Sequence, residues 1–292
     1  MHGFEEFGDI VKTQEPLAPY TSFKVGGPAE LLVQPRSVPE LTAVVKRCSQ
    51  QKVPMRVLGG GGNILVPDDG VRGVVLRLSE AAFTQVAVDS RRLRAGAGTP
   101  LSALISHAAR GGLTGLETLV GIPGSVGGAV HCNAGDRTGE IGQWVRQVEV
   151  LDAQGNQQVR ERDELRFDDQ GCNVDDPVLL AVEFELETDD PAAIHRRMLK
   201  AWIQRKASQP LSFQAAGRIF KNPRGQTAAK LIDGAALAKT RVGGAEVSER
   251  DSNFIVAYPG ASARDIARLI DLVRARVRER FNVELELEIT MW

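Results

Sequence analysis

The sequence predicts an α+β fold in two parts, and three observations support this prediction. The chain has 292 residues, the length of about two domains at roughly 150 residues each. Short apolar or alternating stretches, which are typical of strands, are interspersed with amphipathic stretches that begin at capping residues, as helices do. The 30 glycines cluster in a few loops. We expect a first region over 1–200, in two lobes at 1–75 and 76–200, and a smaller α/β domain over 201–292.

The first helix is expected at 38–51. Ser37 and Glu40 predict a capping box, in which the serine oxygen accepts a bond from a free backbone N–H and the glutamate reaches back to the cap. The apolar face of this helix would consist of Leu41, Val44 and Val45. A second helix is expected over 100–110, between Thr99-Pro100 and a glycine pair. Strands are expected around these helices at 55–58, 64–66, 74–78, 84–88 and 93–95.

The stretch 115–139 is rich in glycine and is expected to be largely loop. A loop of this length in a compact domain usually binds a ligand. Beyond it, a helix is expected to begin after the capping residue Asp190 and to end near residue 207. Strands are expected between that loop and that helix, at 145–152, 158–160 and 179–186.

The C-terminal part is expected to contain a short helix at 227–234, a strand at 253–258 and a longer helix at 262–280. Ser262 and Asp265 predict a second capping box, with aspartate in the place of glutamate. The buried stripe of the longer helix would consist of Ile266, Leu269, Ile270, Val273 and Val277. The last expected element is a half-buried strand over 283–289, in which apolar residues alternate with Glu284, Glu286 and Glu288.

Composition excludes several classes of protein. Lys and Arg total 36 and Asp and Glu total 37, so the net charge of 36 − 37 = −1 argues against a nucleic-acid partner. No apolar run approaches the roughly 18–20 residues that span a bilayer, and the acidic N-terminus is no signal peptide; we therefore expect a cytoplasmic protein without a membrane partner. The cysteines and histidines show neither disulfide nor metal-ligand spacing, so we expect no metal; they are Cys48, Cys132, Cys172, His2, His107, His131 and His195.

The first candidate binding element is a run of four glycines between two expected strands. Successive glycines let backbone amides point at one spot without a Cβ in the way, which suits a diphosphate. The spacing is neither that of a Rossmann loop nor that of a Walker loop. A wide hairpin turn is the alternative, and the residues alone leave both open. The residues are Gly59, Gly60, Gly61, Gly62 and Asn63.

The second candidate binding element is another glycine loop, which offers backbone donors and small side chains to a flat ligand. A long structural loop is the alternative. Two such loops in one half of the chain favour a dinucleotide-like cofactor more than either does alone. The residues are Gly121, Ile122, Pro123, Gly124, Ser125, Gly127, Gly128 and Asn133.

An ordered set of motifs along nearly the whole chain resembles the family of UDP-N-acetylenolpyruvoylglucosamine reductase, also called UDP-N-acetylmuramate dehydrogenase. The compact length resembles the shorter of its two subtypes. Each motif alone is weak, but the ordered set is specific. The motifs are TSFKVGG (21–27), VLGGGGNIL (57–65), GIPGSVGG (121–128), NAG (133–135), FKNP (220–223), GGAEVS (243–248) and NFIV (253–256).

The resemblance implies a vanillyl-alcohol-oxidase/p-cresol-methylhydroxylase-type FAD-binding fold with a smaller C-terminal α/β substrate lobe. It implies that NADPH reduces FAD and that the flavin then reduces the enolpyruvyl ether of a UDP-sugar in peptidoglycan precursor synthesis. The first glycine loop would hold the FAD diphosphate and the second would line the flavin. Asn222, Lys221 and Arg205 would contact the substrate. The oligomeric state stays open.

The sequence departs from the family at catalytic positions. Gln170 stands where the family has an arginine, and Arg218 stands where it has a serine or cysteine acid. Glu288 matches the family's catalytic glutamate. Reduction places negative charge on the carbon beside the substrate carboxylate, so it needs a positive group and a proton donor. An arginine cannot donate the proton, because its pKa exceeds about 12.

One arrangement would restore the chemistry: Arg218 supplies the missing positive charge, and Glu288 or water supplies the proton. Arg218 would then lie within reach of Glu288. Glu288 has an alternative interpretation as one more solvent-facing glutamate of the last strand. The function has alternatives too: a non-catalytic paralogue that binds FAD or a UDP-sugar, or a flavoenzyme repurposed for another substrate.

Overall fold

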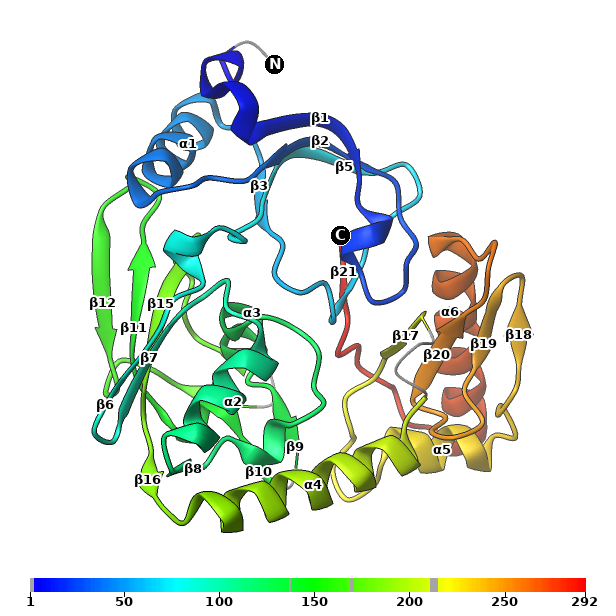
Figure 1. The fold of residues 1–292 in the computed structure, drawn as a ribbon. Helices are drawn as coiled ribbons and strands as arrows, with labels where there is room; N and C mark the ends of the chain where they lie inside the picture. Colours follow the sequence, from blue (N-terminus) through cyan, green and yellow to red (C-terminus); the bar gives the residue numbers. More distant parts are fainter. Residues whose placement is uncertain (1–2, 137, 169–170, 211–214) are drawn as a thin grey trace. The chain divides into compact units, whose positions relative to one another are not determined.

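The chain divides into two compact units. In the computed structural model, residues 3–136, 138–168, 171–210 and 215–292 are described. Unit 1 comprises Met1–Gln14, Glu30–Gly60 and Arg72–Gln204, and unit 2 comprises Glu15–Ala29, Gly61–Val71 and Arg205–Trp292 (Figure 1). The segments 15–29 and 61–71 thus belong to the unit that holds the C-terminal residues, whereas the predicted boundaries place them in the region 1–200.

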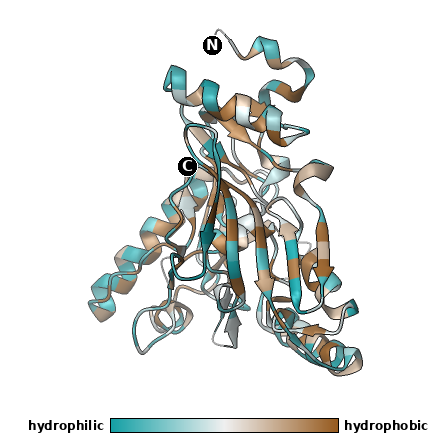
Figure 2. Cartoon of the chain, turned by 90° about the vertical axis from the view of Figure 1, so that its left-hand side faces the viewer, coloured by the Kyte–Doolittle hydropathy of each residue, from teal (hydrophilic) through white to brown (hydrophobic). Residues whose placement is uncertain are grey.

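Unit 1 is built around a five-stranded antiparallel sheet of order β12-β11-β15-β7-β6 (Figure 1). The strands are β6 (Val86–Asp89), β7 (Arg92–Gly96), β11 (Val145–Leu151), β12 (Gln157–Glu161) and β15 (Val178–Glu185), so all five expected strands are confirmed. Apolar residues, brown in Figure 2, recur along these strands. Most of the buried ones form one core with helices α2 (Leu101–Arg110) and α3 (Val126–His131), while Leu151, Val178 and Leu180 belong to a second core.

The prediction that 115–139 is largely loop needs correction, because α3 lies inside it. The Ser125 hydroxyl accepts a hydrogen bond from Gly128 N at 3.3 Å and caps this helix. Val126, Ala129 and Val130 are buried. Six residues with two glycines are too short a pattern to display a helical period in the sequence.

A second sheet, of order β1-β2-β5-β3, packs with helix α1 (Val38–Gln51) around a separate core. Its strands are β1 (Val11–Pro16), β2 (Pro28–Val33), β3 (Met55–Val57) and β5 (Val71–Leu76); β1 and β2 were not expected from the sequence. Ser37 caps α1 as predicted, accepting from Glu40 N at 3.3 Å. The predicted reciprocal half of the box is wrong, because the Glu40 carboxylate accepts from Arg36 N, one residue before the cap.

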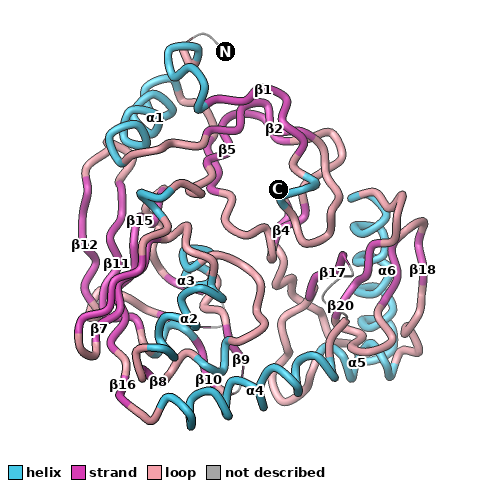
Figure 3. The backbone as a smooth tube through the Cα atoms, in the orientation of Figure 1, coloured by secondary structure: helices cyan, strands magenta, loops and turns pink. Residues whose placement is uncertain are grey.

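Unit 2 contains a four-stranded sheet of order β17-β20-β19-β18, with helices α5 (Ala228–Gly234) and α6 (Ala263–Phe281). Helix α6 packs along β18 and β19 (Figure 3), and its predicted buried stripe is confirmed. The strands are β17 (Ala215–Arg218), β18 (Arg241–Val242), β19 (Ala245–Val247) and β20 (Phe254–Ala257); of these, only β20 was expected.

Three side chains cap the N-terminus of α6. Ser262 and Asp265 form the predicted capping box, with both hydrogen bonds at 3.1 Å. Asp68, from the segment 61–71, accepts from Ala263 N at 2.8 Å and from Arg264 N at 3.0 Å. The free backbone donors of the first helical turn are thereby bonded.

The predicted strand over 283–289 is wrong as a regular strand. Residues 282–286 make no ladder, and Leu287 forms an isolated antiparallel bridge with Phe220. The burial alternation is present, since Leu285 and Ile289 are buried between more exposed glutamates. The pairing instead comes one step later, where β21 (Thr290–Met291) pairs in parallel with β4 (Ile64–Leu65).

Helix α4 (Pro191–Ser208) follows β16 (Glu187–Thr188). It is capped as predicted by Asp190, whose carboxylate accepts from the N–H groups of Ala192 and Ala193 at 3.2 Å. No helix in the part of the chain that the structure describes is long and apolar enough to cross a membrane. The remaining strands are β8 (Leu113–Thr114), β9 (Gly135–Asp136), β10 (Gly139–Glu140), β13 (Phe167–Asp168), β14 (Gly171–Cys172) and β16 (Glu187–Thr188). Short 3-10 helices lie at Glu5–Ile10, Ala18–Tyr20, Ala81–Phe83, Glu117–Leu119 and Ile141–Gln143.

Candidate cofactor cavity and active site

Unit 1 encloses a cavity of about 600 Å³, within the range of about 300–1,000 Å³ that is usual for ligand sites. Both predicted glycine loops contribute to its wall. From the first loop come Gly59 and Gly60, and from the second come Gly124, Ser125, Gly127 and Gly128. The rest of the wall consists of Val57, Leu58, Arg77, Leu78, Ser79, Ala97, Gly98, Pro100, Ser102, His131, Val174, Asp176, Pro177 and Leu179.

The two glycine loops pack against each other without room for side chains. A Cβ placed on Gly60 would lie 2.5 Å from Gly124 Cα, and one on Gly59 would lie 2.5 Å from Ser125 Oγ. Backbone bonds fix the second loop, since Val126 N donates to Thr99 O and Gly127 N to Ala97 O, both at 2.8 Å. The part of the wall that these loops form is therefore bare, fixed backbone, which fits the close approach of a flat, diphosphate-bearing cofactor such as FAD.

The cavity also has polar lining that the sequence did not reveal. Arg77 and His131 are its basic side chains, and Asp176 is an acidic one. The Asp176 carboxylate is held by Arg160, with Nε–Oδ2 at 3.0 Å and Nη2–Oδ1 at 3.1 Å. Arg77 directly follows β5, and Asp176 comes from a loop before β15. Neither belongs to a recognisable motif, so only the folded chain identifies them.

Some predicted cofactor residues are not among those that line the cavity, namely Gly61, Gly62, Asn63, Gly121, Ile122, Pro123 and Asn133. The Asn133 side chain is buried and bonded within unit 1. Its Nδ2 donates to Glu140 Oε2 at 2.7 Å and to Asp168 O at 3.2 Å, and its Oδ1 accepts from Gly142 N at 3.1 Å. These bonds tie the end of α3 to β10 and β13.

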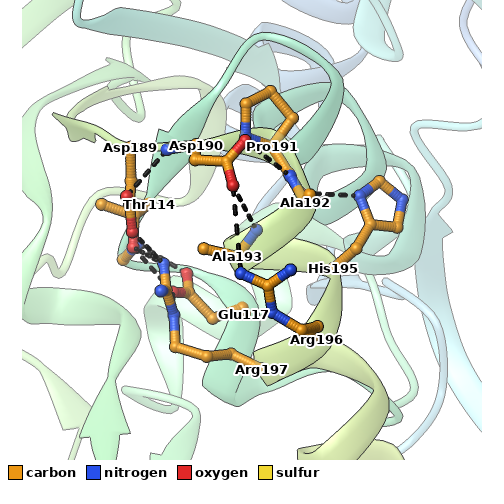
Figure 4. Close-up of polar contacts among 11 residues, drawn as sticks. Thr114, Glu117, Asp189, Asp190, Pro191, Ala192, Ala193, His195, Arg196 and Arg197 are labelled. Atoms are coloured by element: carbon orange, nitrogen blue, oxygen red, sulfur yellow. Dashed lines mark hydrogen bonds and ion pairs between the residues drawn. The ribbon is translucent and has the colours of Figure 1, made fainter.

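A polar network fixes the segment that precedes the second glycine loop (Figure 4). The buried Glu117 carboxylate accepts from Thr114 Oγ1 at 2.6 Å, from Gly115 N at 2.7 Å and from Arg197 Nε at 2.7 Å. Arg197, in α4, also donates to Asp189 Oδ2 at 2.7 Å. The start of α4 and the approach to residues 121–128 are thus joined through one carboxylate.

In unit 2, Arg218 and Glu288 form an ion pair, with Nε–Oε2 at 3.1 Å. This confirms the expectation that the arginine at the family's acid position lies within reach of the glutamate. Both side chains are about one third exposed, at 32% and 36%. The pair is therefore accessible to a solute and partly screened by water.

The backbone around this pair is held by hydrogen bonds. Ile219 O accepts from Glu288 N at 2.8 Å, and Lys221 N donates to Glu286 O at 2.9 Å. Asn253 is buried and bonds to both sides of Phe220, with its Oδ1 accepting from Phe220 N at 2.9 Å and its Nδ2 donating to Phe220 O at 2.7 Å. The NFIV motif thus serves to fix the strand that carries Arg218.

Opposing effects act on the Glu288 carboxyl. Burial raises its pKa, while the positive charges of Arg218 and Lys221 lower it, and the net result is a raised pKa. A carboxylic acid with a raised pKa is better suited to hold a proton near neutral pH. The pKa of Asp251 is also raised, by burial and by Asp233, against a lowering by Arg218.

The other predicted residues of this region lie as follows. Asn222 Oδ1 accepts from Ala228 N at 3.0 Å, at the start of α5. Arg205 is half-buried in the last turn of α4. Gln170 lies outside the described residues. Asn63, with Gly61 and Gly62, belongs to unit 2, and its Nδ2 donates to Glu288 O at 2.9 Å.

Comparison with known proteins assigns both parts of the chain. The family described as UDP-N-acetylenolpyruvoylglucosamine reductase, C-terminal domain, matches residues 209–292, and the FAD binding domain family matches residues 29–159. The chain is 41% identical to UDP-N-acetylenolpyruvoylglucosamine reductase of Moorella thermoacetica, over 97% of this chain and 93% of the relative. It is 42% identical to the reductase of Heliobacterium modesticaldum, over 94% and 88%.

A crystal structure of UDP-N-acetylenolpyruvylglucosamine reductase from Thermus caldophilus is similar, with a TM-score of 0.81 at 38% identity over 97% of this chain and 98% of that one. Together with the FAD binding domain match, it confirms the predicted α+β FAD-binding fold with a C-terminal lobe. Since the similarity covers nearly the whole length, the chain belongs to the UDP-N-acetylenolpyruvoylglucosamine reductase family.

Proposed function

We propose that this protein reduces UDP-N-acetylglucosamine enolpyruvate to UDP-N-acetylmuramate, with NADPH as reductant and FAD as cofactor, in peptidoglycan precursor synthesis in the cytoplasm. The observation that carries the proposal is the 41% identity to a reductase over 97% of the chain. The bare backbone wall of the unit 1 cavity supports FAD as the cofactor. Neither alternative, a non-catalytic paralogue or a repurposed flavoenzyme, gains support from the comparisons.

Bound FAD supplies the transfer of a hydride from NADPH to the substrate. When a hydride adds to the terminal vinyl carbon, the electron pair of the double bond moves to the carbon beside the carboxylate. We assign Arg218 to this carboxylate, because its guanidinium matches a carboxylate in shape and charge. We assign Glu288 as the donor of the proton to the adjacent carbon, because its raised pKa suits an acid.

We assign the remaining site residues to contacts with the substrate or the cofactor. Lys221 lowers the pKa of Glu288 through its charge, and we place it with Asn222 and Arg205 on the UDP-sugar. Gln170 would bond the substrate carboxylate as a neutral donor. Gly59, Gly60, Gly124, Ser125, Gly127 and Gly128 would face the cofactor, because they line the cavity.

The role of Glu288 is tested by Glu288→Gln, which keeps the shape and removes the acid. The control is Glu286→Gln, the same change two residues away on an exposed side chain. After reduction by NADPH, flavin reoxidation by UDP-N-acetylglucosamine enolpyruvate should slow by about a hundredfold or more in Glu288→Gln, the scale of losing a general acid. Glu286→Gln should match the parent. A Glu288→Gln enzyme with the parental reoxidation rate would exclude this glutamate as the acid.

The role of Arg218 is tested by Arg218→Ala and by the double variant Arg218→Ser, Gln170→Arg. Arg218→Ala should weaken binding of the carboxylated substrate by about 2–3 kcal/mol, the scale of losing a charged hydrogen-bond partner. The double variant restores the family's residues and should retain or increase turnover. An inactive parent with an active double variant would support the paralogue alternative. An active parent that Arg218→Ala leaves unchanged in rate and affinity would show that Arg218 does not hold the substrate.

A further inference from the structure

Asn63 ends the first glycine loop, and two of its hydrogen bonds go to the backbone at and just after Glu288. Its side-chain Nδ2 donates to Glu288 O at 2.9 Å. Its own carbonyl accepts from Thr290 N at 2.9 Å. The chain then continues as a parallel pair, Thr290 with Ile64 and Met291 with Leu65. Asn63 therefore holds the chain on the C-terminal side of Glu288.

The N-terminal side of Glu288 is held by a different partner. Glu288 N donates to Ile219 O at 2.8 Å, and Ile219 is the neighbour of Arg218 in sequence. The backbone N–H and C=O of Glu288 are thus bonded to Ile219 and Asn63 respectively. Glu288 lies just past the isolated bridge between Phe220 and Leu287. Its backbone is therefore held by these two hydrogen bonds and not by a regular strand ladder. These two bonds hold the backbone of Glu288, whose side chain lies 3.1 Å from Arg218 Nε.

We infer that Asn63 is a positioning residue for Glu288, through its bond to the Glu288 carbonyl, and not a ligand of the cofactor diphosphate. The inference rests on the proposed function, in which Glu288 donates the proton. A displacement of about 1 Å at a reacting group can cost roughly a hundredfold in rate. Losing one of the two bonds that fix the Glu288 backbone should therefore affect proton donation more than it affects binding.

Asn63→Ala tests this, with Asn156→Ala as the matched control. The Asn156 side chain likewise donates through its Nδ2, to Asp152 Oδ2 at 3.0 Å, but it lies in the exposed turn between β11 and β12. Asn63→Ala should slow flavin reoxidation by UDP-N-acetylglucosamine enolpyruvate by about tenfold or more. Its FAD dissociation constant, measured by flavin fluorescence, and its rate of reduction by NADPH should stay within about twofold of the parent. Asn156→Ala should match the parent in all three.

The pKa of Glu288 gives a readout that does not need the substrate. It can be followed by the pH titration of the Glu288 side-chain carboxyl carbon in NMR, with Glu288→Gln to assign the signal. In Asn63→Ala a looser backbone should reduce the lowering effect of Arg218, so the pKa of Glu288 should rise further. Asn63→Asp keeps the shape but replaces the donor by an acceptor, and should act in the same direction if Asn63→Ala does not fold.

Two results would overturn the inference. One is a large loss of FAD affinity in Asn63→Ala with parental reoxidation and an unchanged pKa of Glu288, which would make Asn63 a cofactor ligand. The other is an Asn63→Ala protein that equals the parent in every measurement. If the parent itself is not reoxidised by the substrate, the proposed function fails, while the titration of Glu288 still decides whether Asn63 positions it.

Discussion

Glu117 offers the sharpest test of how unit 1 is held together. Its carboxylate is only 8% exposed and accepts three hydrogen bonds, from Thr114, Gly115 and Arg197. Glu117→Gln keeps the shape of the side chain but removes its charge. It also places an amide NH2 group, a donor, beside the donor groups of its partners. Breaking a buried pair costs about 3–5 kcal/mol. Arg197 is 43% exposed and keeps Asp189 at 2.7 Å, so we expect a smaller loss of about 2–3 kcal/mol.

The pH dependence of this loss follows from the pKa of Glu117. Burial acts to raise the pKa, but the bonds from Thr114, Gly115 and Arg197 together outweigh burial, and the pKa lies below its ordinary 4.5. A carboxyl with a lowered pKa stabilises the fold above its unfolded-state pKa, and this stabilisation is lost as the pH falls through the folded-state value. The difference between parent and Glu117→Gln should therefore be full near neutral pH and should shrink as the solution is acidified below 4.5.

The assay is thermal unfolding together with hydrogen exchange of the Gly115 amide, which donates to Glu117. A loss of 2–3 kcal/mol should lower Tm by roughly 4–12 °C for a chain of this size, and Gly115 should exchange faster. Glu279→Gln is the control, because Glu279 forms an exposed pair with Arg276 that is worth about 0–1 kcal/mol. An effect of Glu117→Gln no larger than that of Glu279→Gln, or one that does not shrink in acid, would refute the reasoning.

Three further predictions concern single contacts. Gly60→Ala would place a Cβ 2.5 Å from Gly124 Cα, so FAD titration should show weaker binding in this variant; unchanged affinity would count against the shared wall. Cys48 is buried and its pKa is raised to about 11 by burial, whereas Cys132 is exposed. Ellman's reagent should therefore modify Cys132 in the folded protein and Cys48 only after unfolding. Rapid labelling of Cys48 in the folded protein would contradict its burial. Asp68→Ala removes the acceptor for two backbone N–H groups in the first turn of α6. It should lower the free energy of unfolding, measured with denaturant, by about 1–2 kcal/mol. An unchanged free energy of unfolding would show that water replaces the cap.

Much of the fold could be predicted from local patterns. The α6 stripe from Ile266 to Val277 and the box of Ser262 with Asp265 use signals within one or two helical turns, and both are present. The strands β1 and β2 were missed because their residues show no clear alternation, as in the pattern of β1, where only partly buried and exposed positions occur. The segment 283–289 shows the opposite case. Its alternation of buried and exposed residues was predicted correctly, but the segment forms isolated backbone bonds and not a strand ladder.

The candidate site could be predicted only where residue type carries the signal. The glycines of the two loops predict a wall of backbone, and five of them line one cavity together with Ser125. Arg77 and Asp176 line that cavity from positions without a motif. The Arg218–Glu288 pair was expected from the substitutions at family positions. The bond from Asn63 to Glu288 spans 225 residues, and no spacing rule connects such distant groups.

The discontinuous make-up of unit 2 has a consequence for the order in which the chain can fold. Phe23, Val25 and Leu65 belong to the core whose other members lie between Ile219 and Ile289. During synthesis these three apolar side chains emerge long before their partners, because the unit 1 segment Arg72–Gln204 must be made in between, at roughly 5–20 residues per second. Unit 1 can therefore fold first, whereas the segments 15–29 and 61–71 can pack only after the C-terminal residues have been made. Interrupted synthesis should leave these segments as the binding sites for chaperones.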